Sequence, residues 1–163
     1  MAEKSLKDLF VMTLKDVYHA EKQILKALPK MAKNSEGSEL KEALEKHRKE
    51  TEGQVERLEE VFKLMDMKPS AKTCEAIKGL LAEGEEVIEE CEDRGVRDAG
   101  MIAAAQAVEH YEIARYGTLR AWAEELGMDD AATLLEETLQ EEKKADEILN
   151  EIALQGGVNR QAA

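Results

Sequence analysis

The sequence predicts an all-α protein, and its composition and hydrophobic spacing are the two observations behind that prediction. Charged residues make up 36% of the 163 residues, aromatic residues only 4%, and the chain contains two prolines. A composition rich in Ala, Leu, Glu and Lys is typical of long helices rather than sheets. Apolar residues also recur at spacings of three and four, which places them on one helix face. A chain of this length suits a single domain, residues 1–163, with a sizeable core.

Helical spacing and helix-ending residues divide the chain into four long helices and one shorter helical segment. Ser5 is a suitable N-cap for the first helix, which ends at the turn 34–37. Ser38 is expected to cap the second helix, and Asp129 or Asp130 the last. The expected elements are helix 5–33, helix 38–65, a crossover helix at 70–92, helix 96–126, helix 129–154 and a flexible tail at 155–163.

The order of these elements predicts how they pack. A short turn joins the first two long helices, a longer crossover follows, and a second short turn joins the last two. This connectivity favours a four-helix bundle with a helical crossover segment between its second and third long helices. In such bundles, metal sites are built from carboxylates that point inward.

Charge and cysteine content exclude several classes of function. A formal net charge of −13 makes the surface a poor partner for nucleic acid or an anionic membrane, because both select clustered Lys and Arg. The chain has no apolar run near the roughly 20 residues of a membrane span and no signal peptide, so a cytoplasmic location is expected. Cys74 and Cys91 are expected to be reduced and structural, because they form neither a disulfide framework nor a CxxC site.

Two acids interrupt the apolar face of the helix 96–126. Glu109 and Glu112 share a line with Ala105, Tyr116 and Leu119, since residues three or four apart lie on one helix face. An unpaired buried carboxylate is costly. These acids therefore lie either in water at the edge of the apolar face or inside it, compensated by a cation.

The distances of other acids from the predicted turns favour the interior. In an antiparallel helical hairpin, residues equally far from the turn lie at one level. Glu21 and Glu50 are about 15 and 14 residues from the first turn, and Glu112 and Glu142 about 16 and 14 from the second. Each of the four helices thus offers an acid near its middle.

Glu109 and Asp146 match in the same way around the second turn. Any one of the 36 acids taken alone is more simply a solvated surface residue. Agreement in level and face across four helices instead indicates a shared interior site for one or two metal ions. Ligation mainly by carboxylates favours iron, manganese or magnesium over copper. The candidate ligands are Glu21, Glu50, Glu109, Glu112, Glu142 and Asp146.

Polar and aromatic side chains near these acids are candidates for supporting roles. His47 stands one turn before Glu50, and its imidazole could be a ligand, a partner that orients the carboxylate, or a core histidine. Ordinary core, boundary or surface positions are the alternative for the aromatic residues and the other histidine. The remaining candidates for contact with the ligands are Gln54, Tyr18, Tyr116 and His110.

Several blocks of the sequence carry a family resemblance that covers nearly the whole chain. The most specific are Val108–Ala114 and Tyr116–Leu119; the others are Asp16–Gln23, His47–Gln54, Val96–Ala99, Ala103–Gln106, Leu135–Leu139 and Glu141–Asp146. In these blocks the sequence resembles the YciF/YciE family of bacterial stress-associated proteins, which are ferritin-like and related to rubrerythrins.

The resemblance implies a ferritin-like bundle, a homodimer and a site similar to the di-iron centre of rubrerythrin-like proteins. It implies that Glu21 and Glu50 are the acids of the first two helices, Glu109 and Glu112 the pair of the third, and Glu142 the bridging acid of the fourth. The chain departs from the usual pattern because its Glu-x-x-His pairs are absent. With fewer imidazole ligands, iron or manganese is expected, and magnesium, zinc or an empty site are the alternatives. It also has no rubredoxin-like CxxC segment, so a redox reaction would need a separate electron donor.

The leading hypothesis is a stress-associated, ferritin-like protein whose metal site oxidises ferrous iron or reduces peroxide. Its rival is a non-enzymatic, dimeric helical interaction protein without a redox-active metal, whose interior polar groups bond to one another. A ferritin-style storage cage is a third, weaker hypothesis.

Overall fold

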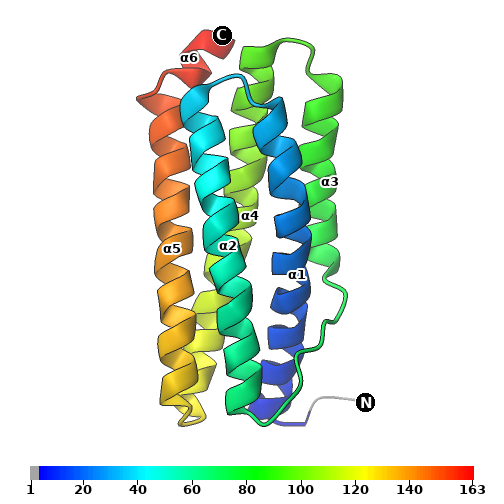
Figure 1. Ribbon diagram of the computed structural model, residues 1–163, viewed down its shortest axis with the longest axis vertical. Coiled ribbons are helices and arrows are strands. Elements are labelled where there is room, and N and C mark those ends of the chain that lie inside the picture. Colours follow the sequence, from blue (N-terminus) through cyan, green and yellow to red (C-terminus); the bar gives the residue numbers. More distant parts are fainter. Residues whose placement is uncertain (1–3) are drawn as a thin grey trace.

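The structure, a computed structural model, describes residues 4–163. In this range the chain forms six α-helices and no β-strand, which confirms the all-α prediction. Figure 1 shows them in chain order. Their bounds are α1 Leu6–Asn34, α2 Ser38–Leu64, α3 Glu75–Glu90, α4 Arg94–Glu125, α5 Asp129–Leu154 and α6 Val158–Ala162.

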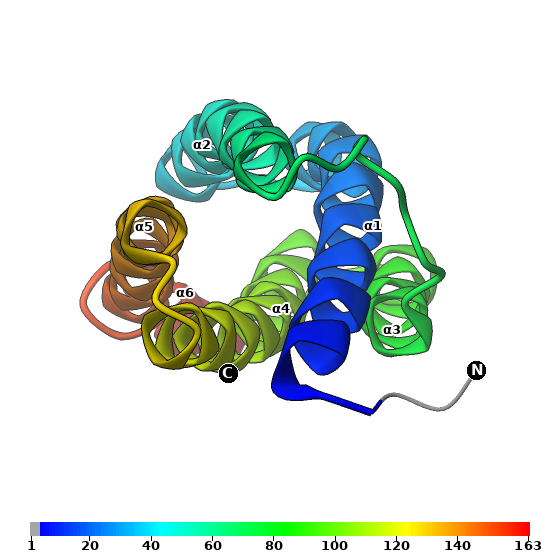
Figure 2. The ribbon, with the colours of Figure 1, turned by 90° about the horizontal axis from the view of Figure 1, so that it is seen from below.

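The four long helices α1, α2, α4 and α5 stand side by side and, seen from one end, surround a common interior (Figures 1 and 2). In this bundle α1 contacts α2 and α4, and α5 contacts α2 and α4. The crossover helix α3 lies outside, against α1 and α4. Each long helix therefore directs one face into the same interior.

Local capping explains where three of the helices begin. The Ser5 hydroxyl accepts a hydrogen bond from the Asp8 N–H at 3.1 Å, as predicted. Asp93 caps α4 by accepting from the Val96 N–H at 2.9 Å, so this helix starts at Arg94, two residues earlier than expected. The sulfur of Cys74 caps α3, which begins at Glu75 rather than at residue 70. Residues 67–74 before it have no regular structure.

The expectation that Ser38 caps α2 is wrong, and a residue of another helix secures the turn before α2. Gly37 occupies the N-cap position, and no side chain of its own can cap the helix. Instead the buried Asp98 of α4 accepts hydrogen bonds from the N–H groups of Glu36 at 3.0 Å and Gly37 at 2.8 Å. A contact distant in the sequence thus fixes the turn between α1 and α2.

Two further local expectations differ from the structure. Met128 occupies the N-cap position of α5 without a side-chain hydrogen bond, while Asp129 and Asp130 lie in the first turn. Negative charge is favourable there because of the helix dipole. The tail expected to be flexible contains α6, in which Val158 packs against the bundle core.

Two apolar clusters occupy the interior. The helix segments that carry them lie in the lower and the upper half of the bundle in Figure 1. The lower cluster consists of Phe10, Leu14, Val17, Tyr18, Leu58, Val61, Phe62, Tyr116, Leu119, Ala123, Ala131, Ala132, Leu135 and Leu139. The upper cluster consists of Ala20, Ile24, Leu28, Met31, Ala32, Leu40, Leu44, Cys74, Ile77, Met101, Ile102, Ala105, Val108, Leu149, Ile152 and Ala153.

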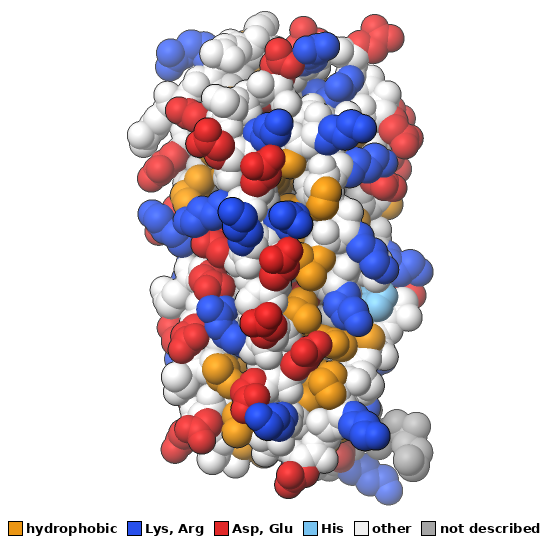
Figure 3. Space-filling view, in the orientation of Figure 1, with side chains coloured by type: hydrophobic (Ala, Val, Ile, Leu, Met, Phe, Trp, Pro, Cys, Tyr) orange, Lys and Arg blue, Asp and Glu red, His pale blue; other side chains and the backbone are white. Residues whose placement is uncertain are grey.

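Charged side chains of both signs are interspersed over the face shown in Figure 3, with a few apolar side chains between them. Along the described residues, no helix is both long and apolar enough to cross a bilayer. A group of buried polar and charged side chains lies inside the bundle, between the two apolar clusters.

Candidate metal centre

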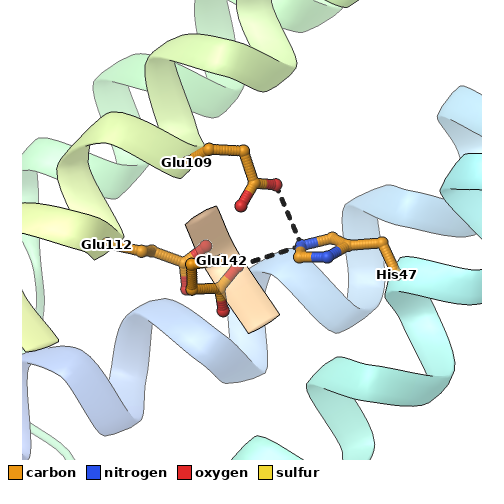
Figure 4. A group of neighbouring side chains, drawn as sticks. All are labelled: His47, Glu109, Glu112 and Glu142. Atoms are coloured by element: carbon orange, nitrogen blue, oxygen red, sulfur yellow. Dashed lines mark ion pairs between the residues drawn. The ribbon is translucent and has the colours of Figure 1, made fainter. Parts of the chain in front are cut away.

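Three carboxylates and one imidazole converge in the middle of the bundle. His47 comes from α2, Glu109 and Glu112 from α4, and Glu142 from α5. Figure 4 shows their polar ends directed toward one another. Each residue offers one ligand atom, and these atoms lie within 4.8 Å of one another. All four residues are at least nine-tenths buried.

Helix geometry brings these residues to one level. Glu109 and Glu112 are three residues apart on the inner face of α4, between the buried Ala105 and Tyr116. Glu142 lies on the inner face of α5 and is fully buried. The equal distances of Glu112 and Glu142 from the second turn predict such a meeting, and the structure brings the two acids into one group.

The imidazole faces the carboxylates closely without forming a hydrogen bond. His47 Nε2 is 3.1 Å from Glu109 Oε1 and 3.8 Å from Glu142 Oε2. Within the described residues, neither His47 nitrogen has a hydrogen-bond partner. Burial lowers the pKa of His47 to about 4, so the ring is neutral at pH 7, the form in which imidazole binds metals.

The carboxylate oxygens of this group also lack donors. In residues 4–163 no group donates a hydrogen bond to Glu109 Oε2 or to either oxygen of Glu112 and Glu142. Buried polar atoms in folded proteins almost always have partners, and each one without a partner costs about 1–3 kcal/mol. So many unpartnered ligand atoms in one place fit a cation that binds them all.

Burial also raises the pKa values of the acids. It raises the pKa of Glu142 to about 7 and, with help from the charge of Glu142, the pKa of Glu21 to about 8. The pKa values of Glu109 and Glu112 rise well above their ordinary value, again by burial first and then by the neighbouring acids. Without a cation these acids therefore hold protons that a divalent metal would displace.

Glu21 and Tyr116 extend the group toward α1. The Tyr116 hydroxyl donates a hydrogen bond to Glu21 Oε1, whereas Glu21 Oε2 has no partner among the described residues. Both side chains are fully buried. Of the two candidate tyrosines, Tyr116 thus contacts a candidate ligand, whereas the Tyr18 hydroxyl donates to Glu59 at 2.8 Å, away from the group.

The other two predicted acids lie at the rim. The side chain of Glu50 is 26% exposed, and its Oε2 is 4.0 Å from His47 Nδ1. Asp146 is 23% exposed and lies at the contact between α4 and α5. There it accepts a hydrogen bond from Gln106 at 3.3 Å and pairs with His110 Nε2 at 3.2 Å. These partners hold Asp146 outside the group of four.

A polar clamp beside the group involves two residues that the sequence analysis missed. The buried Gln54 donates to Glu141 Oε2 at 3.0 Å, and Arg57 binds both oxygens of Glu141 at 2.8 and 2.7 Å. Two positional signals could have indicated the clamp. Arg57 is one turn beyond Gln54, and Glu141 adjoins Glu142.

Sequence comparison places the chain in a family. Residues 5–163 match the family described as "Domain of unknown function (DUF892)". The chain belongs to this family. This DUF892 member is also 47% identical over 163 residues to Protein YciF of Escherichia coli strain K12. The match covers 99% of this chain and 98% of that protein. The resemblance to YciF expected from the sequence blocks is confirmed.

Solved structures of similar proteins share the fold. YcfI from Rhodopseudomonas palustris matches this DUF892 chain with a TM-score of 0.91 and 51% identity, covering 93% of this chain and 96% of that one. The crystal structure of the E. coli stress protein YciF gives 0.90 and 47%, with the same coverage. A protein from Xanthomonas campestris pv. campestris matches with a TM-score of 0.73 and 23% identity, covering 96% of this chain and 98% of that one. At this identity the match shows a shared fold alone.

Proposed function

We propose that this DUF892 protein is a stress-associated, ferritin-like four-helix bundle that binds one or two divalent metal ions in its interior. His47, Glu109, Glu112 and Glu142 bind the metal, and Glu21 completes the set. The observation that carries the proposal is the convergence of buried ligand atoms without hydrogen-bond partners. The stress association rests on the similarity to the E. coli stress protein YciF.

The charge of the group supports a cation more strongly than a metal-free polar network. A hydrogen-bonded network needs donors, but the nearest buried donors serve other acceptors: Gln54 donates to Glu141, and Tyr116 occupies only one oxygen of Glu21. Several buried carboxylates without donors are stable only when protonated or bound to a cation. A divalent ion therefore suits this donor set.

The ligand types narrow the choice of metal. Carboxylate oxygens with one imidazole suit iron or manganese, while magnesium prefers oxygen ligands alone and zinc also accepts this mixture. Iron or manganese bound here would supply one-electron redox chemistry, for which oxidation of ferrous iron and reduction of peroxide are the candidate reactions. A separate electron donor would be needed for turnover with peroxide.

The residues around the ligands have distinct roles in this proposal. Tyr116 fixes the orientation of Glu21, and the Gln54–Arg57–Glu141 clamp joins α2 to α5 beside the group. Glu50 and Asp146, both partly exposed, provide negative charge at the rim that attracts cations. We also propose a homodimer, on the basis of the family resemblance; size-exclusion chromatography with light scattering tests it.

Metal analysis decides between binding and its absence. Protein purified without chelator, and protein titrated anaerobically with Fe²⁺ or Mn²⁺, is expected to bind one or two ions per chain. The double variant Glu112→Gln with Glu142→Gln should bind none. The matched control changes two exposed acids on the same helices, Glu125→Gln with Glu151→Gln. Unchanged metal content in the Glu112/Glu142 variant would rule out the proposed centre.

Activity assays test the rival hypothesis separately. The metal-loaded protein is mixed with excess Fe²⁺ in air, or with hydrogen peroxide and a reductant. Turnover that disappears in the double variant supports a redox enzyme. Metal binding without either reaction supports a structural role for the ion.

A further inference from the structure

Two adjoining cavities lie in the upper half of the protein. The first has a volume of about 40 Å³ and is bounded mostly by apolar side chains from the four long helices. The second, of about 30 Å³, lies between α1, α3 and α4. Ala27, Met31, Leu81 and Val108 border both cavities. The two spaces therefore adjoin across these four side chains. Together they mark a mostly apolar route, called the passage below, from the α1–α3 contact into the bundle.

The inner end of this passage meets the candidate metal centre. His47 and Glu109 border the first cavity. Both residues are more than nine-tenths buried, and His47 Nδ1 and Glu109 Oε2 have no hydrogen-bond partner among the described residues. The passage is thus mostly apolar, with His47 and Glu109 at its inner end and the partly exposed Lys46 and Glu50 also bordering the first cavity.

Small side chains create this space. Ala27, Ala43, Ala105 and Ala145 border the first cavity, and Gly84 borders the second. The corresponding interior of the lower half is filled by aromatic rings, including Phe10 and Phe62. Protein interiors are close-packed, so alanine at these interior positions leaves room that neighbouring side chains do not fill.

The size and lining of the passage define what it can admit. A water-sized guest needs about 10–15 Å³, so the first cavity holds a molecule of only a few atoms. Ions lose too much hydration energy in an apolar space. Hydrogen peroxide loses hydrogen bonds there, whereas dioxygen has none to lose. At the outer end, the ion pair between Lys30 Nζ and Glu85 Oε1, 3.0 Å apart, joins α1 to α3 beside the second cavity.

We propose that this passage binds dioxygen, or another small apolar molecule of its size, and delivers it to the His47–Glu109 side of the metal centre. The delivery role rests on the proposed metal-binding function, whereas binding of a small apolar guest does not.

Xenon is a suitable probe, since it is apolar, monatomic and independent of any metal. Metal-free protein under xenon pressure is expected to show a bound xenon-129 signal, with shifts of the methyl resonances of Ala27, Leu81 and Val108. The variant Ala27→Leu fills the junction of the two cavities and should lose this signal. Ala82→Leu adds the same atoms at an exposed position of α3 and serves as the control.

A second variant keeps the test valid if Ala27→Leu does not fold. Ala145→Leu narrows the passage at a half-buried position and should also weaken xenon binding, with an unchanged circular dichroism spectrum. In iron-loaded protein, both variants should slow the oxidation of Fe²⁺ by dissolved dioxygen severalfold. Metal content and oxidation by hydrogen peroxide should not change.

Two results would overturn the inference: no xenon signal in the native protein, or a signal that Ala27→Leu leaves unchanged. Slowed oxidation by peroxide but not by dioxygen would overturn the choice of guest. If xenon binds but metal does not, the passage stands as a guest site, and the metal centre and delivery to it are refuted.

Discussion

The two halves of the bundle interior are built differently. The lower cluster contains four aromatic rings, and the rings of Tyr18 and Phe62 meet edge to face with centroids 5.6 Å apart. The buried members of the upper cluster, within residues 4–163, are aliphatic or sulfur-containing, and two cavities lie among them. Between the halves lies the layer of buried acids and His47. The lower half is therefore filled by aromatic rings, whereas the upper half contains two cavities, one of which is bordered by His47 and Glu109.

The largest expected effect distinguishes the two halves directly. Leu58 and Leu44 lie on the same inner face of α2, one in each cluster, and both are almost fully buried. We expect Leu58→Ala to reduce the free energy of unfolding by about 4–5 kcal/mol and Leu44→Ala by about 2–3 kcal/mol. Leu44 loses fewer contacts because it already borders a cavity. Urea denaturation measures both, and equal losses would contradict the contrast between the halves.

The polar layer predicts an unusual dependence of stability on pH. The raised pKa values of Glu142, about 7, and Glu21, about 8, mean that the folded metal-free protein binds more protons than the unfolded chain above pH 4.5. Its free energy of unfolding should therefore fall as pH rises from 5 to 8, by about 3 kcal/mol or more.

Thermal melts in chelator at these pH values test this prediction. Added Mn²⁺ should stabilise the protein more at pH 8 than at pH 5, because protons compete with the metal. The Glu112→Gln with Glu142→Gln variant should lose the stabilisation by Mn²⁺ and part of the pH dependence, because Glu21 and Glu109 remain. Metal-free protein that becomes more stable as pH rises would show that the acids are not held protonated by burial.

A smaller effect is expected at the upper end of the bundle, where a side chain secures a turn. Asp98→Ala removes both acceptors for the Glu36 and Gly37 N–H groups and should cost about 1–3 kcal/mol. Asp98→Asn keeps one acceptor and should cost less. Chemical denaturation of the native protein and the two variants measures their free energies of unfolding. An Asp98→Ala variant as stable as the native protein would show that the turn does not depend on α4.

The smallest effect on stability is expected at two glycines, Gly84 in α3 and Gly100 in α4, which lie in facing helices of the upper half. A Cβ at Gly84 would lie 3.6 Å from the Ala104 Cβ, an ordinary contact, so Gly84→Ala should stabilise the protein by about 0.5–1 kcal/mol. A Cβ at Gly100 would lie 2.6 Å from Val87 Cγ1, so Gly100→Ala should destabilise it. Thermal melts distinguish the two, and stabilisation by both would show that α3 moves freely against α4.

Residues within one hairpin were the easiest to predict. Glu109, Glu112 and Glu142 come from two helices joined by a short turn, so counting residues from that turn places them at one level. Between the hairpins no such count applies, and His47 could be weighed only as one of three possibilities. Asp146 matched in level, but its partners Gln106 and His110 hold it at the rim. Level follows from the helical rise, whereas side-chain direction depends on neighbours.

The sequence by itself determined the helical class and most helix boundaries, because hydrophobic spacing and local caps such as Ser5 act within one element. It also indicated which acids share an inner face. Only the tertiary structure decided that His47 completes the group, that Asp98 caps the turn before α2, and that alanines leave an apolar passage beside the centre. These features depend on contacts between helices, whose rotation and spacing are set by packing across the whole interior.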